Sequence, residues 1–72
     1  MSQYDRLDGL ILDRLESDGT SYGDLFSGPL WEECCRLEAA TGRYSSRILD
    51  GRLQALRKYG FIFYSSKRWW RY

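Results

Sequence analysis

The chain has 72 residues, of which 43% are hydrophobic and 17% aromatic, and it carries 11 Lys or Arg against 10 Asp or Glu. This composition excludes a disordered or low-complexity chain, and the length allows one small domain over residues 1–72. The sequence has neither an apolar run of membrane-spanning length nor a signal-peptide pattern, so we expect a cytoplasmic protein.

The first expected element is a helix over residues 4–17. Four apolar residues recur there at the spacing of one helix face: Leu7, Leu10, Ile11 and Leu15. Ser2 or Asp5 can cap the start of this helix, and the pair Asp18 and Gly19 is expected to end it. The helix would therefore bury one apolar stripe against the rest of the domain.

Three short signals follow the first helix. Residues 20–22 favour a brief extended segment. A single helical turn is predicted at residues 24–26, because Ser21 and the aspartate three positions later have the spacing of a capping box. Pro29 fits the first turn of a new helix, where its missing N–H costs nothing, and this second helix is predicted over residues 30–40.

A third helix is predicted over residues 46–59, joined to the second by a short turn that contains Gly42. Ser45 or Ser46 is expected to cap its start, and Gly60 is expected to end it. Two helices joined by a short glycine-containing turn have the form of a helix-turn-helix unit.

The last segment predicts a β-hairpin. Aromatic and β-branched residues at 61–64 and 69–72 flank a polar, turn-like segment at 65–68. Because successive strand residues point to opposite faces, one of Trp69 and Trp70 is expected in the core and the other outside it. The sequence therefore predicts an α+β fold with three helices and a C-terminal hairpin.

Charge is distributed unevenly along the chain. Residues 1–42 hold three Arg and nine acidic residues, a net charge of −6, whereas residues 43–72 hold eight Lys or Arg and one Asp, a net charge of +7. The folded domain should therefore have one acidic and one basic end, and only the basic end would attract a polyanion.

Residues 44–72 also carry a recognisable pattern. A serine-capped helix with apolar residues on one face leads into Lys58-Tyr59-Gly60, then two apolar residues, then a basic and aromatic end at 67–72. This stretch resembles the second half of winged helix-turn-helix DNA-binding domains, such as small stand-alone phage or bacterial regulators, while residues 1–43 match only in the order of elements. The resemblance implies a recognition helix at 46–59, a wing at 61–72 and a role in transcription regulation.

The third helix predicts a DNA-contacting surface, because its basic and amide residues lie opposite its apolar arc. Arg47 can donate two bonds to guanine, Gln54 can pair with adenine, and Gly51 would let the helix backbone approach the duplex. Phosphate contacts are expected from six further residues: Arg43, Ser46, Arg57, Lys58, Lys67 and Arg68. Asp50 at the edge of this surface would repel phosphate unless it accepts from a cytosine or pairs with Arg57.

Two charged residues lie within apolar helix faces. Arg52 lies in the apolar arc of the third helix, and Glu38 lies in that of the second. We predict a partly buried structural ion pair between Glu38 and Arg52, since each charge would otherwise be desolvated alone. The alternative is that each side chain extends to water separately.

The sequence gives no support for catalysis or for a metal site. It has no His, and its two cysteines, Cys34 and Cys35, are adjacent, so we expect half-buried helical thiols and no disulfide framework. No nucleophile or phosphate-loop motif is present. We therefore expect no enzymatic activity, no cofactor and no small-molecule substrate.

Two alternatives remain open beside double-stranded DNA as the partner. The same basic surface would suit a protein-interaction module, an adaptor or an inhibitor that docks on an acidic protein, because a fold does not dictate a function. Homodimerisation is the other alternative, since two-fold symmetry doubles a short DNA site. A dimer would use the acidic first helix or the edge of the hairpin.

Overall fold

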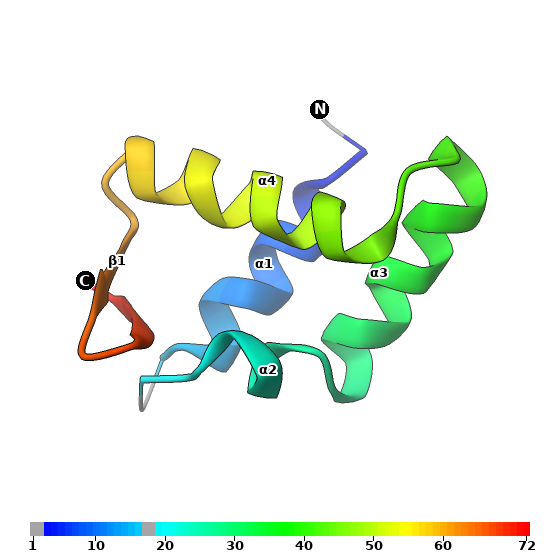
Figure 1. Ribbon diagram of the computed structural model, residues 1–72. Coiled ribbons are helices and arrows are strands. Elements are labelled where there is room, and N and C mark those ends of the chain that lie inside the picture. Colours follow the sequence, from blue (N-terminus) through cyan, green and yellow to red (C-terminus); the bar gives the residue numbers. More distant parts are fainter. Residues whose placement is uncertain (1–2, 17–18) are drawn as a thin grey trace.

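The computed structural model describes residues 3–16 and 19–72 (Figure 1). These residues form four helices and two strands: α1 (Asp5–Arg14), α2 (Tyr22–Leu25), α3 (Gly28–Thr41), α4 (Ser45–Lys58), β1 (Ile62–Ser65) and β2 (Arg68–Arg71). The predicted α+β fold is confirmed, because three longer helices are followed by an antiparallel hairpin in the order of a winged helix-turn-helix layout.

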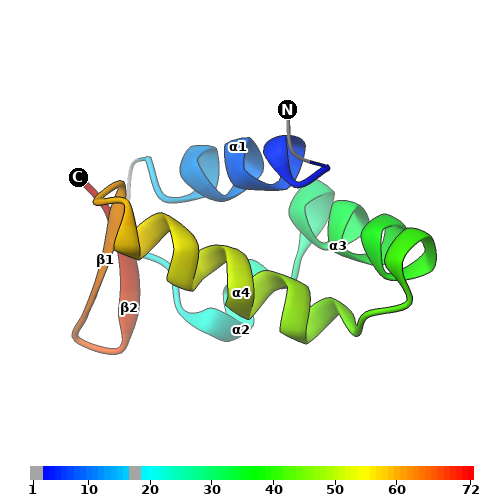
Figure 2. The same ribbon diagram turned by 90° about the horizontal axis from the view of Figure 1, so that it is seen from above.

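The three longer helices surround one core, and the hairpin extends it. α4 packs against α3, α3 packs against α1, and the hairpin lies beyond the C-terminal end of α4, away from the turn that joins α3 to α4 (Figures 1 and 2). The buried apolar side chains are Leu7, Ile11, Leu15, Leu25, Leu30, Cys34, Leu37, Ile48, Leu49, Leu53, Leu56, Ile62 and Trp69. Burial stabilises each of the larger of these side chains by about 1.5–3 kcal/mol relative to exposure.

Several local signals act as predicted. The Ser21 hydroxyl accepts a hydrogen bond from the backbone N–H of Asp24 at 3.4 Å and caps α2. Pro29 lies in the first turn of α3. Gly42, with φ of 75°, ends α3, and Gly60, with φ of 85°, follows the end of α4. Glycine adopts these left-handed conformations without the steric cost of a Cβ atom.

The predicted cap of α4 is wrong. α4 begins at Ser45, so neither Ser45 nor Ser46 precedes it, and the N-cap residue is Tyr44, which makes no side-chain cap bond. Its carbonyl oxygen instead accepts from the backbone N–H groups of Arg47 and Ile48, both at 3.0 Å. Tyr44 is 72% exposed, and its side chain makes no cap bond to this helix start.

α1 is shorter than the predicted helix and ends at Arg14. Its N-cap residue is Tyr4, without a side-chain cap bond, so Asp5 is the first helical residue and not the cap. The predicted contributions of Ser2 and Asp18 lie outside the described residues. The apolar stripe of this helix is buried as expected, with Leu7 and Ile11 fully enclosed.

The hairpin is closed by a tight turn and extended by the early segment. Ser65 pairs with Arg68, and the two residues between them, Ser66 and Lys67, have φ of 53° and 63°, as in the turns that match the twist of paired strands. On the other edge of β2, Thr20 exchanges two backbone hydrogen bonds with Trp69, at 3.0 and 2.9 Å. The predicted extended segment at 20–22 is therefore limited to Thr20 and Ser21, because Tyr22 begins α2, two residues before the helical turn predicted at 24–26.

Candidate nucleic-acid interface

α4 divides into a buried and an exposed face. Ile48, Leu49, Leu53 and Leu56 are almost fully buried in the core. All three residues predicted to contact bases, Arg47, Gly51 and Gln54, are exposed on the other face. The helix therefore presents guanidinium and amide donors to the surroundings while its apolar face holds it in place.

The residues predicted to contact phosphate lie in three places. Ser46, Arg57 and Lys58 are exposed on α4 itself. Arg43 is exposed in the turn that leads into α4. The remaining two lie in the hairpin: Lys67 in its turn and Arg68 at the start of β2. All six are exposed and accessible to a polyanion. They lie in two separate regions, namely α4 with the turn before it, and the hairpin.

Arg68 also has a structural role. Its guanidinium donates to the carbonyl oxygen of Gly19 at 3.2 Å and so ties β2 to the segment before α2. A carbonyl is neutral, so this bond leaves the positive charge of Arg68 unneutralised. Arg71 makes a similar, longer bond of 3.4 Å to the carbonyl oxygen of Leu12 in α1.

The predicted ion pair between Glu38 and Arg52 is wrong. Arg52 pairs with Asp8 of α1, through Nε at 2.9 Å and through a terminal guanidinium nitrogen at 2.8 Å. The same guanidinium lies over the ring of Tyr4, 5.2 Å from its centroid. The arc of α4 that carries Arg52 therefore faces α1 and not α3. The hydrogen bond to Asp8 also raises the pKa of Arg52 above its usual value.

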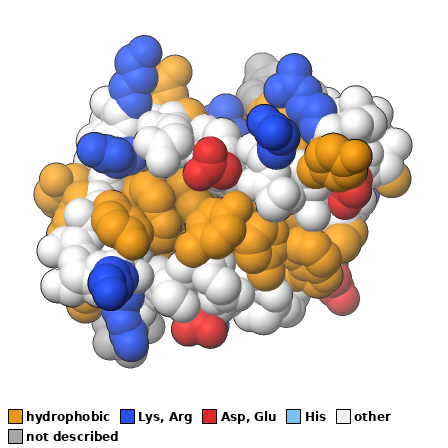
Figure 3. Space-filling view, viewed as in Figure 1, with side chains coloured by type: hydrophobic (Ala, Val, Ile, Leu, Met, Phe, Trp, Pro, Cys, Tyr) orange, Lys and Arg blue, Asp and Glu red, His pale blue; other side chains and the backbone are white. Residues whose placement is uncertain are grey.

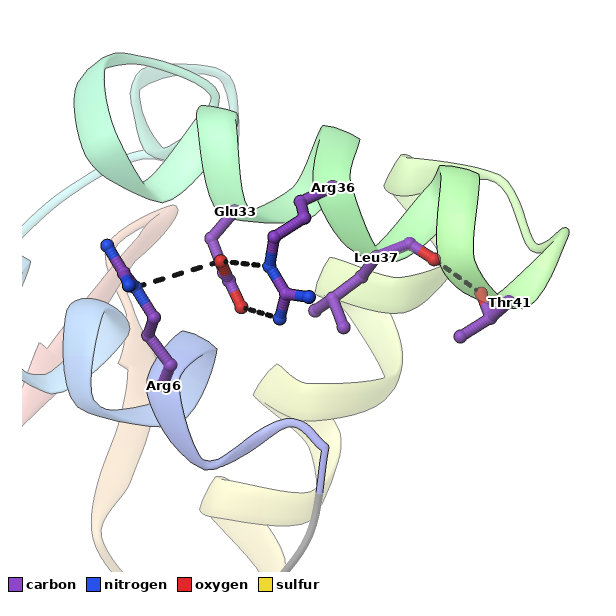
Figure 4. A network of polar contacts seen from close by, with 5 residues as sticks. All are labelled: Arg6, Glu33, Arg36, Leu37 and Thr41. Carbon is purple, nitrogen blue, oxygen red and sulfur yellow. Dashed lines mark hydrogen bonds and ion pairs between the residues drawn. The ribbon is translucent and has the colours of Figure 1, made fainter.

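The buried acidic residue of α3 is Glu33, only 4% exposed (Figure 4). Arg36 donates two hydrogen bonds to its carboxylate, at 2.8 and 2.6 Å, and Arg6 of α1 lies at 3.7 Å. The hydrogen bond from Arg36 lowers the pKa of Glu33, against the opposing effect of burial. Sequence reasoning missed this group, although Glu33 precedes Cys34 and lies one helical turn from Leu37 on the buried face of α3.

A row of aromatic rings lies beside the start of α4. The rings of Tyr22 and Phe26 meet edge to face at 5.1 Å, and those of Phe26 and Trp31 meet edge to face at 5.0 Å. The Tyr22 hydroxyl donates to the carbonyl oxygen of Ser46 at 3.0 Å and so joins this row to α4. Burial, and then the negative charge of Asp50, raise the pKa of Tyr22.

Figure 3 shows an apolar stripe across the face that carries α2 and α4, with basic side chains in separate groups around it and acidic side chains near it. Tyr22 and Trp31, at 36% and 37% exposure, contribute apolar surface at the edge of the core. Tyr22 and Phe26 are four positions apart, a helical spacing that could have indicated this aromatic row, although the β-favouring residues at 20–22 predict an extended segment there. The candidate interface is therefore mixed in character and not uniformly basic.

Neither cysteine belongs to a binding site that the structure defines. Cys34 is buried in α3 and Cys35 is half-buried, and both thiols are free. Burial raises the pKa of Cys34 to about 11.

Over residues 3–16 and 19–72, no three His, Cys, Asp or Glu side chains gather as metal ligands would. In the same part of the chain, every helix is too short or too polar to cross a membrane.

The two tryptophans of β2 separate as predicted. Trp69 is 5% exposed and belongs to the core, whereas Trp70 is half-buried on the opposite side of the hairpin.

Comparisons of the chain with protein-family models, with curated proteins and with solved structures found no match. A function for this surface has therefore to be argued from its own geometry and charge.

Proposed function

We propose that this protein binds double-stranded DNA as a small transcription regulator, with α4 in the major groove and the hairpin along the backbone or adjacent minor groove. The observation that carries the proposal is the exposed face of α4. It presents Arg47 and Gln54 around Gly51, while the opposite face is locked into the core. Base-reading helices of helix-turn-helix proteins present side chains from such a face.

Gly51 supports this reading because the fold does not require a glycine there. A Cβ atom at this position would have no neighbour within 4 Å. Glycine inside a helix costs about 0.5–1 kcal/mol relative to alanine, since it loses more conformational freedom on folding. A bare backbone at the centre of the exposed face of α4 allows close approach of a base edge or a sugar.

Each side chain of this face has a definite chemical use in a DNA groove. Arg47 has the planar donor pair that fits O6 and N7 of guanine, and Gln54 has the donor and acceptor that fit N7 and N6 of adenine. Asp50 can accept a bond from N4 of cytosine. The Lys and Arg residues at 43, 57, 58, 67 and 68 would bind phosphates and displace counterions.

The test is fluorescence anisotropy of a labelled duplex titrated with the protein at low and moderate salt. We expect binding that weakens steeply with salt, because phosphate contacts release counterions. Gln54→Ala should reduce the free energy of binding to a selected duplex by about 1–3 kcal/mol and should change binding to other duplexes little. Lys67→Ala should weaken binding to all duplexes alike. Arg14→Ala, an exposed arginine of α1, is the control and should bind as the unchanged protein does. Absence of binding at low salt would refute the proposal.

A protein-interaction module is the second candidate, and the aromatic row favours it. The Tyr22 hydroxyl donates to the carbonyl oxygen of Ser46 in α4, the rings of Phe26 and Trp31 continue the row, and partly exposed aromatic rings are common anchors in protein interfaces. An adaptor or inhibitor of this kind, phage-encoded or not, would tolerate Gln54→Ala and lose its acidic partner with Trp31→Ala. A duplex that stays unbound at low salt would direct the search to such a partner.

A further inference from the structure

The outer side of the hairpin carries four aromatic rings, which we name the hairpin aromatic face: Phe61, Phe63, Trp70 and Tyr72. Ile62 and Trp69 are buried, so the alternate residues of each strand point away from the core. The backbone N–H of Tyr72 donates to the carbonyl oxygen of Phe61 at 3.2 Å, which continues the pairing one residue beyond the strands. All four rings therefore share one side of the sheet.

Three of these rings pack in a row before any ligand arrives, with Phe63 between Trp70 and Tyr72. Phe63 and Trp70 lie nearly parallel, 15° apart with centroids at 6.5 Å, and Tyr72 lies 4.7 Å from Phe63. The indole N–H of Trp70 donates to the carbonyl oxygen of Ser65 at 2.9 Å. Gly19 packs directly against the indole of Trp70. A Cβ atom at position 19 would lie 2.6 Å from the ring, so a larger residue would clash with it. A fixed platform loses little entropy when a planar group stacks on it.

The platform is open and its surroundings are cationic. Tyr72 is 79% exposed and Phe61 is 53% exposed. Apart from Arg52, which pairs with Asp8, residues 51–72 contain five Lys or Arg and no acidic residue. Lys67 and Arg68 come from the hairpin itself, and Arg68 keeps its charge because its bond partner is a neutral carbonyl.

We propose that the hairpin aromatic face binds single-stranded nucleic acid, with bases stacked on Tyr72 and Phe61 and phosphates bound by Lys67 and Arg68. Sequence-tolerant single-strand binders combine aromatic platforms with a positively charged path for the backbone. This activity goes beyond the proposed duplex binding, because it uses the aromatic face of the hairpin instead of the exposed face of α4, while Lys67 and Arg68 would bind phosphates in both. A second copy of the chain fits the face less well, since two such faces would bring their cations together.

The experiment measures anisotropy of labelled dT and rU strands of about eight nucleotides, a length within the usual site sizes. These strands do not pair with themselves, and the two arms tell DNA from RNA. Tyr72→Ala is the main variant, because its ring is mostly exposed and its loss removes no core contact. Tyr44→Ala is the matched control: Tyr44 is equally exposed and lies near basic residues, but at the other end of α4.

We expect at least one of the two strands to bind, and Tyr72→Ala to weaken that binding about fivefold or more, as loss of one stacked base predicts. Tyr44→Ala should leave the affinity unchanged. Failure of both strands to bind, or equal affinities for Tyr72→Ala and the unchanged protein, would overturn the inference. The inference would also be overturned if sedimentation velocity showed a dimer that Tyr72→Ala no longer forms, because the hairpin aromatic face would then join two copies of the chain.

The outcome is separable from that of the proposed function. Gln54→Ala should affect only duplex binding and Tyr72→Ala mainly single-strand binding, because the two residues lie on different elements. A protein that binds dT but no duplex would refute the proposal for α4 and retain this one. The reverse pattern would refute this one alone.

Discussion

Arg52 of α4 and Asp8 of α1, which are 44 positions apart in the sequence, form a two-bond ion pair between the two helices. Both side chains are largely shielded, at 23% and 18% exposure, and the ring of Tyr4 covers the guanidinium from another side. The pair adds a polar tie between α4 and α1 to the apolar packing that sets which residues of α4 face outward.

The energetic coupling of this pair can be measured with a double-mutant cycle. We expect Arg52→Met and Asp8→Asn each to lower the free energy of unfolding by about 1.5–3 kcal/mol, the usual range for hydrogen bonds to charged groups. The double variant should be less destabilised than the sum of the two, with a coupling of about 1–2 kcal/mol. Urea unfolding followed by circular dichroism gives these values, and strictly additive effects would contradict the pairing.

Glu33 makes stability depend on pH in a defined direction. Its pKa is lowered in the folded protein, so its contribution is present above the unfolded-state pKa and is lost as the pH falls through the folded-state pKa. Glu33→Gln should cost about 1 kcal/mol at neutral pH, and the difference from the unchanged protein should shrink below about pH 4.

Its control is Glu32→Gln, which removes the same charge from an exposed neighbour on α3. Thermal unfolding of both variants across acidic and neutral pH makes the comparison. Equal pH profiles for the two variants would show that the bonds from Arg36 do not stabilise the fold.

The contact between Gly19 and Trp70 predicts a position-specific effect of one methyl group. Gly19→Ala would place a Cβ atom 2.6 Å from the indole, so the ring must shift, and we expect a loss of about 1–3 kcal/mol. Gly23→Ala is the matched control, because a Cβ atom in α2 has no neighbour within 4 Å there. Denaturant midpoints report the stability, and near-ultraviolet circular dichroism reports the indole. A neutral Gly19→Ala would mean that Trp70 packs elsewhere.

The adjacent cysteines should differ in reactivity although they share one helix. Cys34 is buried, and its pKa of about 11 leaves little thiolate at pH 8. We expect iodoacetamide to modify the folded protein at Cys35 only, and to modify both thiols in denaturant. Mass spectrometry of Cys35→Ser and Cys34→Ser variants separates the two sites, and fast labelling of folded Cys35→Ser would contradict the burial of Cys34.

The sequence was sufficient for those features that depend on neighbours along the chain. The apolar spacing of Ile48, Leu49, Leu53 and Leu56 defined the buried face of α4, and Gly42 and Gly60 marked helix ends. The exposure of Arg47, Gly51 and Gln54 follows from the same periodicity.

Features that depend on the packing of distant elements could not be predicted in the same way. A helical wheel places Arg52 in an inward arc, but it does not say whether α1 or α3 covers that arc. The sequence pattern therefore predicts Glu38 as the partner of Arg52, whereas the partner in the structure is Asp8. The aromatic row is a similar case, because its contact with α4 depends on how the short helix α2 docks against Ser46. Whether the exposed face of α4 meets DNA remains a prediction that the titration decides.

The bridge between Thr20 and Trp69 has a consequence for the order in which the protein folds. The two residues are 49 positions apart, so the bridge can close only after the helices between them and the hairpin turn have been synthesised. The helices depend on more local contacts and can associate earlier, whereas the hairpin must form and dock across a long loop at an entropic cost. A chain truncated before residue 69 would therefore lack the buried Trp69 and leave one end of the core open to solvent.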